Sequence, residues 1–214
     1  MINNKKKRPF SVSKYNNVKE EIREIKVILL GETGVGKTNI IGRYLTGNFD
    51  SLSNPTLGST FGEKIIKREG CTYSLKVWDT TGQEKYNSIT KLFIKGAQIV
   101  ILVYSIDNIS SFQKINFWHN YINEELSKKK YILGILGNKK DLFESEVVSE
   151  EDGKRMAKEK DAIFGLVSAK VDKKGIEKYF EMLLDEFIIR FGGENLSESS
   201  FSLEENSNSQ KKCC

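Results

Sequence analysis

The stretch GETGVGKT at residues 31–38 constrains the fold of this chain more than any other feature of its sequence. It directly follows IKVILL, a short, apolar, β-branched run that predicts a strand buried on both faces of a parallel sheet. It precedes NIIGRYLTG, which predicts a helix that ends at Gly47. Glycines between a strand and a helix let the backbone turn tightly, so that successive N–H groups point inward. The stretch therefore predicts a strand–loop–helix unit whose loop can surround an anion.

The spacing of these residues fits the phosphate-binding loop, G-x-x-x-x-G-K-[ST]. The positive end of the helix dipole would add to the attraction for phosphate, and Lys37 would reach the β- and γ-phosphates as a catalytic residue. Thr38 would ligate Mg²⁺. The nucleotide-binding residues expected in this region are Thr33, Gly34, Val35, Gly36, Lys37, Thr38 and Asn39. An ordinary glycine-rich turn is the alternative, and the loop alone separates neither ATP from GTP nor a kinase from a switch.

The rest of the chain alternates strand-like and helix-like stretches. Short apolar runs predict strands at 61–67, 73–79, 98–105, 131–138 and 162–169. Helical spacing of apolar residues or a capping pattern predicts helices at 110–127, 149–160 and 176–188. Strands that alternate with helices predict an α/β fold, with a doubly wound, mostly parallel six-stranded sheet flanked by helices.

Composition favours a single domain, because 214 residues with 38% hydrophobic content can form one core and no Pro- or Gly-rich linker divides the middle. We expect a mobile, lysine-rich extension at 1–22, the folded domain at 23–191 and a disordered Ser-, Glu- and Asn-rich tail at 192–214.

The remaining composition excludes several classes of protein. The net charge of +5 is mild and no aromatic residues interleave with the basic runs, so we expect no nucleic-acid partner. Three cysteines give neither a disulfide framework nor a zinc spacing. No apolar stretch approaches the roughly 18 residues of a membrane span, and we expect the chain in the reducing cytosol.

Three later stretches narrow the choice of nucleotide. Asp79 ends one predicted strand and can hold the waters of a magnesium ion. GNKKD at 137–141 and VSAK at 167–170 follow two further strands, so all three lie at the carboxyl edge of the sheet, where ligands of this architecture bind. Asp141 can accept hydrogen bonds from N1–H and N2–H₂ of guanine, whereas adenine offers neither donor there. Such a site can discriminate by about 10⁴-fold or more, which favours guanine.

Taken together and in this order, the motifs resemble those of small GTPases of the Ras superfamily, and specifically the Rab family. The Rab likeness depends on LGSTF at 57–61, KYNSIT at 85–90, FIKGA at 93–97, LVYSID at 102–107 and the terminal Cys213 and Cys214. The resemblance covers about residues 22–190. It implies a switch that hydrolyses GTP slowly and regulates vesicle traffic by recruiting effectors to membranes. The alternative is a GTP-gated binding module with little or no intrinsic hydrolysis.

The resemblance also implies roles for individual residues around the nucleotide. Phe49 would place its ring edge-on against guanine, and Lys139 would lay its stem over the opposite face. The backbone N–H of Ala169 would meet guanine O6, and Asn138 would tie its loop to the phosphate-binding loop. The nucleotide-binding set is completed by neighbours in these loops, namely Asp141, Ser168 and Lys170.

Two switch segments follow from the same resemblance. Thr56 would bind Mg²⁺ through its hydroxyl and the γ-phosphate through its N–H, and Gly82 would donate its N–H to the same phosphate. Gln83 would orient the attacking water as a catalytic residue. The segment at 48–60 contains no arginine, so we expect slow hydrolysis that needs an arginine from a partner, worth about 10³ to 10⁵ in rate. Thr33 and Thr81 add bulk near this water, and we hypothesise that they slow hydrolysis further.

Aromatic residues and the terminal cysteines predict contacts with other molecules. Phe61, Trp78 and Phe93 match the aromatic triad that Rab proteins present to effectors; without the resemblance they would be core or half-buried aromatics. Cys213 and Cys214 would carry two geranylgeranyl anchors, since a single lipid gives only marginal attachment. The implied partners are GTP and GDP, an exchange factor, a GTPase-activating protein, an escort or GDP-dissociation inhibitor, a prenyltransferase and effectors. We expect a monomer that cycles between the cytosol and the cytosolic face of intracellular membranes.

Overall fold

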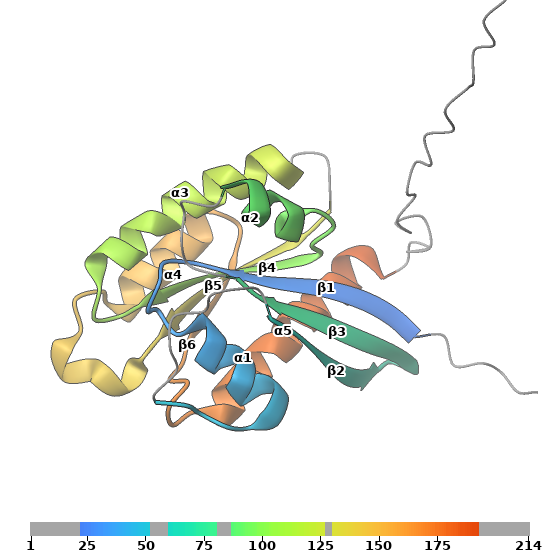
Figure 1. Cartoon of the computed structure of the whole chain (residues 1–214), viewed down its shortest axis with the longest axis horizontal. Helices are drawn as coiled ribbons and strands as arrows, with labels where there is room; N and C mark the ends of the chain where they lie inside the picture. The colour runs from blue at the N-terminus through green and yellow to red at the C-terminus, as the bar shows by residue number, and fades with distance from the viewer. Residues whose placement is uncertain (1–21, 52–59, 81–86, 127–129, 193–214) are drawn as a thin grey trace, which may run out of the picture.

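The computed structural model describes residues 22–51, 60–80, 87–126 and 130–192 (Figure 1). Some of the residues singled out above lie outside these ranges, as do nearly all of the predicted N-terminal extension and tail. The residues concerned are Thr56, Thr81, Gly82, Gln83, Cys213 and Cys214.

A mixed sheet of six strands forms the centre of the described structure, in the order β2-β3-β1-β4-β5-β6. The strands are β1 (Ile22–Leu30), β2 (Thr60–Arg68), β3 (Cys71–Asp79), β4 (Ile99–Ser105), β5 (Ile132–Asn138) and β6 (Ile163–Leu166). β1 pairs in parallel with both β3 and β4, whereas β2 pairs antiparallel with β3 at the edge of the sheet. The prediction of a six-stranded, mostly parallel sheet is therefore confirmed.

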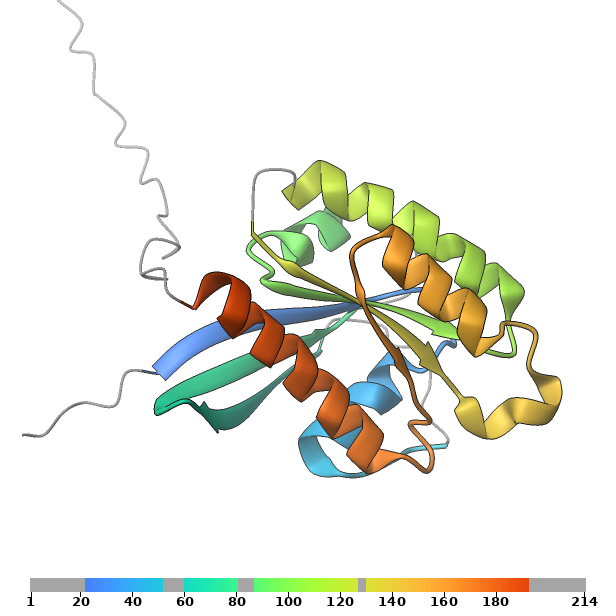
Figure 2. The same ribbon diagram turned by 180° about the vertical axis from the view of Figure 1, so that it is seen from behind.

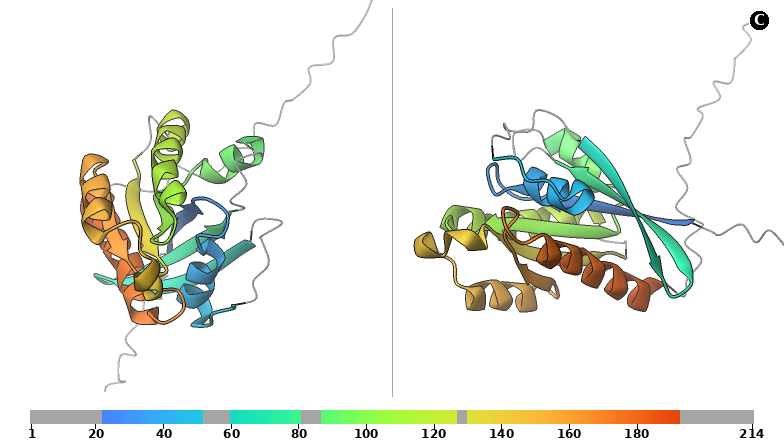
Figure 3. Two further views of the ribbon diagram at one scale, coloured as in Figure 1. Left: turned by 90° about the vertical axis from the view of Figure 1, so that its left-hand side faces the viewer. Right: turned by 90° about the horizontal axis from the view of Figure 1, so that it is seen from below.

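Helices cover both faces of this sheet. They are α1 (Lys37–Thr46), α2 (Asn87–Ile94), α3 (Ile109–Leu126), α4 (Glu150–Glu159) and α5 (Lys173–Phe191), with a short 3₁₀ segment η2 (Lys140–Ser145). α1 and α5 lie on one face, and α2, α3 and α4 lie on the other, as the views from behind and from the side show (Figures 2 and 3). None of the described helices is both long enough and apolar enough to cross a bilayer.

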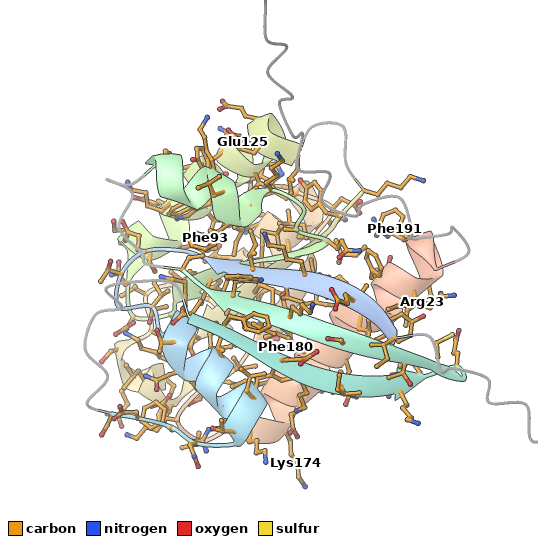
Figure 4. The ribbon with its side chains drawn as sticks, turned by 45° about the vertical axis from the view of Figure 1, so that its right-hand side comes forward. Arg23, Phe93, Glu125, Lys174, Phe180 and Phe191 are labelled. Atoms are coloured by element: carbon orange, nitrogen blue, oxygen red, sulfur yellow. The ribbon has the colours of Figure 1, made fainter. Side chains whose placement is uncertain are left out.

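Strand β1 is buried on both faces from Val27 to Leu30, within the apolar run that predicts this burial. Val27 and Leu29 pack into a core cluster with α1 and α5, whereas Ile28 and Leu30 pack into a second cluster with α3 and α4. Phe180 of α5 stacks on Tyr44 of α1 in the first cluster, with ring centroids 3.8 Å apart. Phe180 and Phe93 of α2 lie on opposite sides of the sheet (Figure 4).

Local signals account for several of the element ends. Gly47 ends α1 in the left-handed conformation, and its N–H donates to the carbonyl of Arg43 at 3.0 Å. Ser149 caps α4, where its hydroxyl accepts from the N–H of Asp152 at 3.1 Å. Two elements, α2 and η2, were not predicted from the sequence. η2 has no buried residues, so it lacks the apolar periodicity that predicts a helix.

Candidate functional site

The loop between β1 and α1 depends on glycine at two positions. Gly31 has φ 148°, and a Cβ on it would lie 2.2 Å from the carbonyl oxygen of Val103 in β4. Gly36 has φ 96° and immediately precedes α1; a Cβ there would lie 2.4 Å from Nδ2 of Asn138. Both positions combine a conformation that favours glycine with a close approach to a neighbouring strand or loop. The backbone of the 31–36 loop is therefore held against the ends of β4 and β5.

Lys37 is the first residue of α1, and its side chain folds back over this loop. Its Nζ donates to the carbonyls of Gly31 and Glu32, both at 2.8 Å, and the residue is only 6% exposed. A buried ammonium is costly unless hydrogen bonds or an opposite charge compensate it. The fold thus fixes a positive charge at the centre of a loop that has N–H groups to offer to an anion.

Thr38 and Asp79 meet beside the loop. The Thr38 hydroxyl donates to Oδ2 of Asp79 at 2.6 Å, and Asp79, the last residue of β3, is buried. The next residue, Thr80, donates its hydroxyl to the Leu29 carbonyl at 2.6 Å and so fixes the end of β3 against β1. A hydroxyl and a carboxylate are oxygen donors that Mg²⁺ accepts, usually together with phosphate oxygens and water. This pair therefore fits a magnesium ion that also binds phosphate oxygens. The described residues contain no cluster of three or more His, Cys, Asp or Glu that could hold a metal ion.

Asn138 at the end of β5 joins two loops. Its Nδ2 donates to the carbonyl of Val35 at 2.8 Å, and its Oδ1 accepts from the N–H of Ala169 at 3.0 Å. All three residues are buried. Because one amide side chain satisfies groups on both sides, it fixes the 31–36 loop and the 168–170 loop relative to each other.

The residues after Asn138 are also held in place. Lys139 adopts φ 64°, and its Nζ lies 3.7 Å from Oδ1 of Asp107. Asp141 accepts a hydrogen bond at Oδ1 from the hydroxyl of Ser168, which is buried. Lys170 is exposed at the end of the second loop. The carboxylate, the lysine stem and the 168–170 loop thus surround one region at the carboxyl edge of the sheet, on the left in Figure 1.

The side chain of Arg43 contributes to this edge although sequence reasoning assigned it no role. Its guanidinium donates to the carbonyls of Ala169 at 2.8 Å, Lys170 at 2.6 Å and Gly47 at 2.7 Å. It also lies 5.8 Å from the ring centre of Phe49. No local signal identifies such a residue, because two of its partners are more than 120 positions away in the chain.

The aromatic residues Phe61, Trp78 and Phe93 form a row across β2, β3 and α2. Phe61 and Trp78 are opposite each other in the sheet register, with ring centroids 5.1 Å apart, and Trp78 and Phe93 are 5.7 Å apart. Phe61 is 51% exposed, and the other two are half-buried. The row is therefore a partly exposed apolar surface and not part of the closed core.

Comparison with known proteins agrees with this geometry. The model of the Ras family matches residues 26–189. The chain belongs to the Ras family. Among curated relatives of this Ras-family chain, RabC of Dictyostelium discoideum is 34% identical over 88% of the chain and 96% of the relative. Human Rab-37 is 36% identical over 88% of the chain and 85% of the relative. The rice protein RGP2 is 35% identical over 75% of the chain and 73% of the relative.

This Ras-family chain is a Rab-like small GTPase that hydrolyses GTP and regulates membrane traffic. The alternative of a binding module without hydrolysis is not favoured by these relatives. The predicted recognition, fold class and general activity are thereby confirmed.

Proposed function

We propose that the described edge of the sheet binds GTP and GDP as their Mg²⁺ complexes, through the residues expected from the sequence. The observation that supports this most strongly is the convergence of three groups from three different strand ends. The Lys37 ammonium, the Thr38–Asp79 pair and the Asn138 amide all hold or flank the 31–36 loop. Such a convergence is what a triphosphate with its cation needs, since it combines backbone N–H groups, one fixed positive charge and oxygen donors.

The phosphate side of the site would be formed by the N–H groups of residues 33–36, with Asn39 behind them. Lys37 would move its ammonium from the Gly31 and Glu32 carbonyls toward the β- and γ-phosphates, or share it among them. Thr38 and Asp79 would hold Mg²⁺, with Thr56 completing the set. The ion would neutralise charge on the phosphates when bound. The protein's own contribution is to hold these groups close to the 31–36 loop before the nucleotide arrives.

The base side would be formed by residues from three loops. Asp141 would accept from N1–H and N2–H₂ of guanine, and Lys139 and Phe49 would cover its two faces. Ala169 would offer its N–H to O6, with Ser168 and Lys170 beside it. In the structure this N–H already donates to Asn138, so it would be shared between Asn138 and the base.

Hydrolysis would depend on groups in the second switch, where Gln83 orients the water and Gly82 binds the γ-phosphate. We expect a slow intrinsic rate that a partner's arginine raises by about 10³ to 10⁵. Thr33 is exposed at the start of the loop, where its side chain can crowd that water. Single-turnover hydrolysis of the wild type, Thr33→Gly and Thr81→Ala tests this proposal. Faster hydrolysis by the variants is the expected result, whereas equal rates would exclude a role for the threonines. Turnover of several GTP per second by the wild type alone would exclude a slow intrinsic rate.

The partners and the membrane association complete the proposal. Phe61, Trp78 and Phe93 would contact effectors, and their partial exposure is compatible with that role. Prenyl groups on Cys213 and Cys214 would place the chain on the cytosolic face of an intracellular membrane, with an escort or GDP-dissociation inhibitor carrying it between membranes. An exchange factor and a GTPase-activating protein would drive the cycle of the monomer. A Cys213→Ser, Cys214→Ser double variant that still partitions to membranes in cells would contradict the lipid anchor.

A further inference from the structure

We infer that Arg43 is a positioning residue for the guanine-binding loops and that it controls how long the nucleotide stays bound. The inference builds on the proposed function, because it assigns a part of that same site. No motif includes Arg43, which lies on the second turn of α1. Its importance follows only from the contacts that its guanidinium makes.

Arg43 binds backbone carbonyl groups of the 168–170 loop. Ala169 is 3% exposed, and its carbonyl accepts from Nε of Arg43 at 2.8 Å. The N–H of the same residue donates to Asn138 at 3.0 Å. Both polar groups of Ala169 are therefore held, one by Asn138 and the other by Arg43. Since Ala169 would present its N–H to guanine O6, these two bonds determine where that donor lies.

Arg43 also lies beside the residue that would cover one face of the base. The guanidinium lies 5.8 Å from the ring centre of Phe49, which would cover one face of guanine. It also donates to Gly47 at 2.7 Å, so it fixes the backbone two residues before that ring. One planar group thus joins the end of α1, the segment that carries Phe49 and the 168–170 loop. Lysine could not replace it, because an ammonium is a point charge and cannot match this fork of donors.

A role limited to folding would have a different consequence. The bond to Gly47 stabilises the end of α1 whether or not a nucleotide is present. The bonds to Ala169 and Lys170 instead cross to a loop 126 and 127 positions away, and that loop has its own link to β5 through Asn138. Loss of Arg43 should therefore leave the fold in place while the O6 donor becomes less well positioned.

The test uses the full chain with Mg²⁺ and compares Arg43→Lys with Arg68→Lys. Arg68 is the matched control, since it bonds Glu181 and Asp185 of α5 at the opposite edge of the sheet. Release rates are measured for GDP, for 6-thioguanosine diphosphate, which alters only the O6 position, and for inosine diphosphate, which lacks only the 2-amino group. Melting temperatures of the nucleotide-free proteins report any general loss of folding.

We expect Arg43→Lys to release GDP about tenfold faster or more, since a hydrogen bond to a charged group is worth about one factor of ten. The preference for GDP over 6-thioguanosine diphosphate should shrink, while the preference over inosine diphosphate stays, because Asp141 reads the 2-amino group. Arg68→Lys should change neither. If Arg43→Lys matches Arg68→Lys, or accelerates all three diphosphates by the same factor, the positioning role is wrong. ADP release from the wild type is measured as well. If the wild type releases GDP and ADP equally fast, the proposed function fails instead, and this inference with it.

Discussion

The central sheet is stabilised in different ways at its carboxyl edge, where the parallel strands end, and at the opposite edge, where they begin. At the carboxyl edge, the buried side chains of Lys37 and Asn138 and the half-buried side chain of Arg43 bond to backbone groups of the loops around the site. At the opposite edge, Arg68 pairs with Glu181 and Asp185 of α5, and the side chains of all three are between 31% and 50% exposed. Buried hydrogen bonds fix a geometry and are costly to break, whereas exposed ion pairs contribute little and are screened by salt. The carboxyl edge, where polar groups are buried at a cost in free energy, is therefore the edge that we propose binds the nucleotide.

The largest effect should come from Lys37→Ala. We expect nucleotide affinity to fall by about 3 kcal/mol or more, which is about 10²-fold or more, because a fixed charge is removed from the phosphates. The nucleotide-free chain should not be destabilised, since the buried ammonium itself is costly. Titration with GDP and thermal melting measure the two quantities. Unchanged nucleotide affinity would mean that the buried charge at the carboxyl edge does not bind the nucleotide.

Asn138→Ala should have the next largest effect. It leaves the carbonyl of Val35 and the N–H of Ala169 buried without this partner, which costs about 2–4 kcal/mol in the free energy of unfolding. Denaturant unfolding of the nucleotide-free chain measures this change, and GDP release should also accelerate. A loss below about 0.5 kcal/mol would mean that the two loops do not depend on this amide.

The smallest effect is expected for Arg68→Gln at the opposite edge. Removal of the exposed pairs should cost about 1 kcal/mol or less, and the cost should shrink as salt is raised, because exposed charges are screened. GDP release should be unchanged. Denaturant unfolding at low and high salt, with the release rate measured in parallel, provides the check. A loss as large as that of Asn138→Ala would remove the distinction between the two edges.

Much of this fold is encoded locally and could be predicted. The apolar runs of β1, β4 and β5 predict strands buried on both faces, and Gly47 and Ser149 mark the ends of their helices. Strand order is not a local property, and no periodicity places β2 at the edge or β1 between β3 and β4. The short elements α2 and η2 are likewise missed, since neither has a long apolar pattern.

Some residues of the site could likewise be predicted from the sequence, and others could not. Residues in motifs, such as Lys37 and Asp141, could be chosen because their chemistry follows from their spacing to glycines or strand ends. Arg43 could not, since its bonds to Ala169 and Lys170 exist only once the chain has folded. Its three acceptors are backbone carbonyls, which every residue has, so the sequence gives no sign of which ones it will meet.

Competition between GTP and ATP for the purified chain tests the central claim most directly. With labelled GDP bound in the presence of Mg²⁺, GTP should displace the label at stoichiometric concentrations, while ATP should fail even at about 10⁴-fold excess because it offers Asp141 no donor pair. Displacement by ATP at concentrations similar to those of GTP would contradict the proposal that this edge of the sheet is a guanine-nucleotide site.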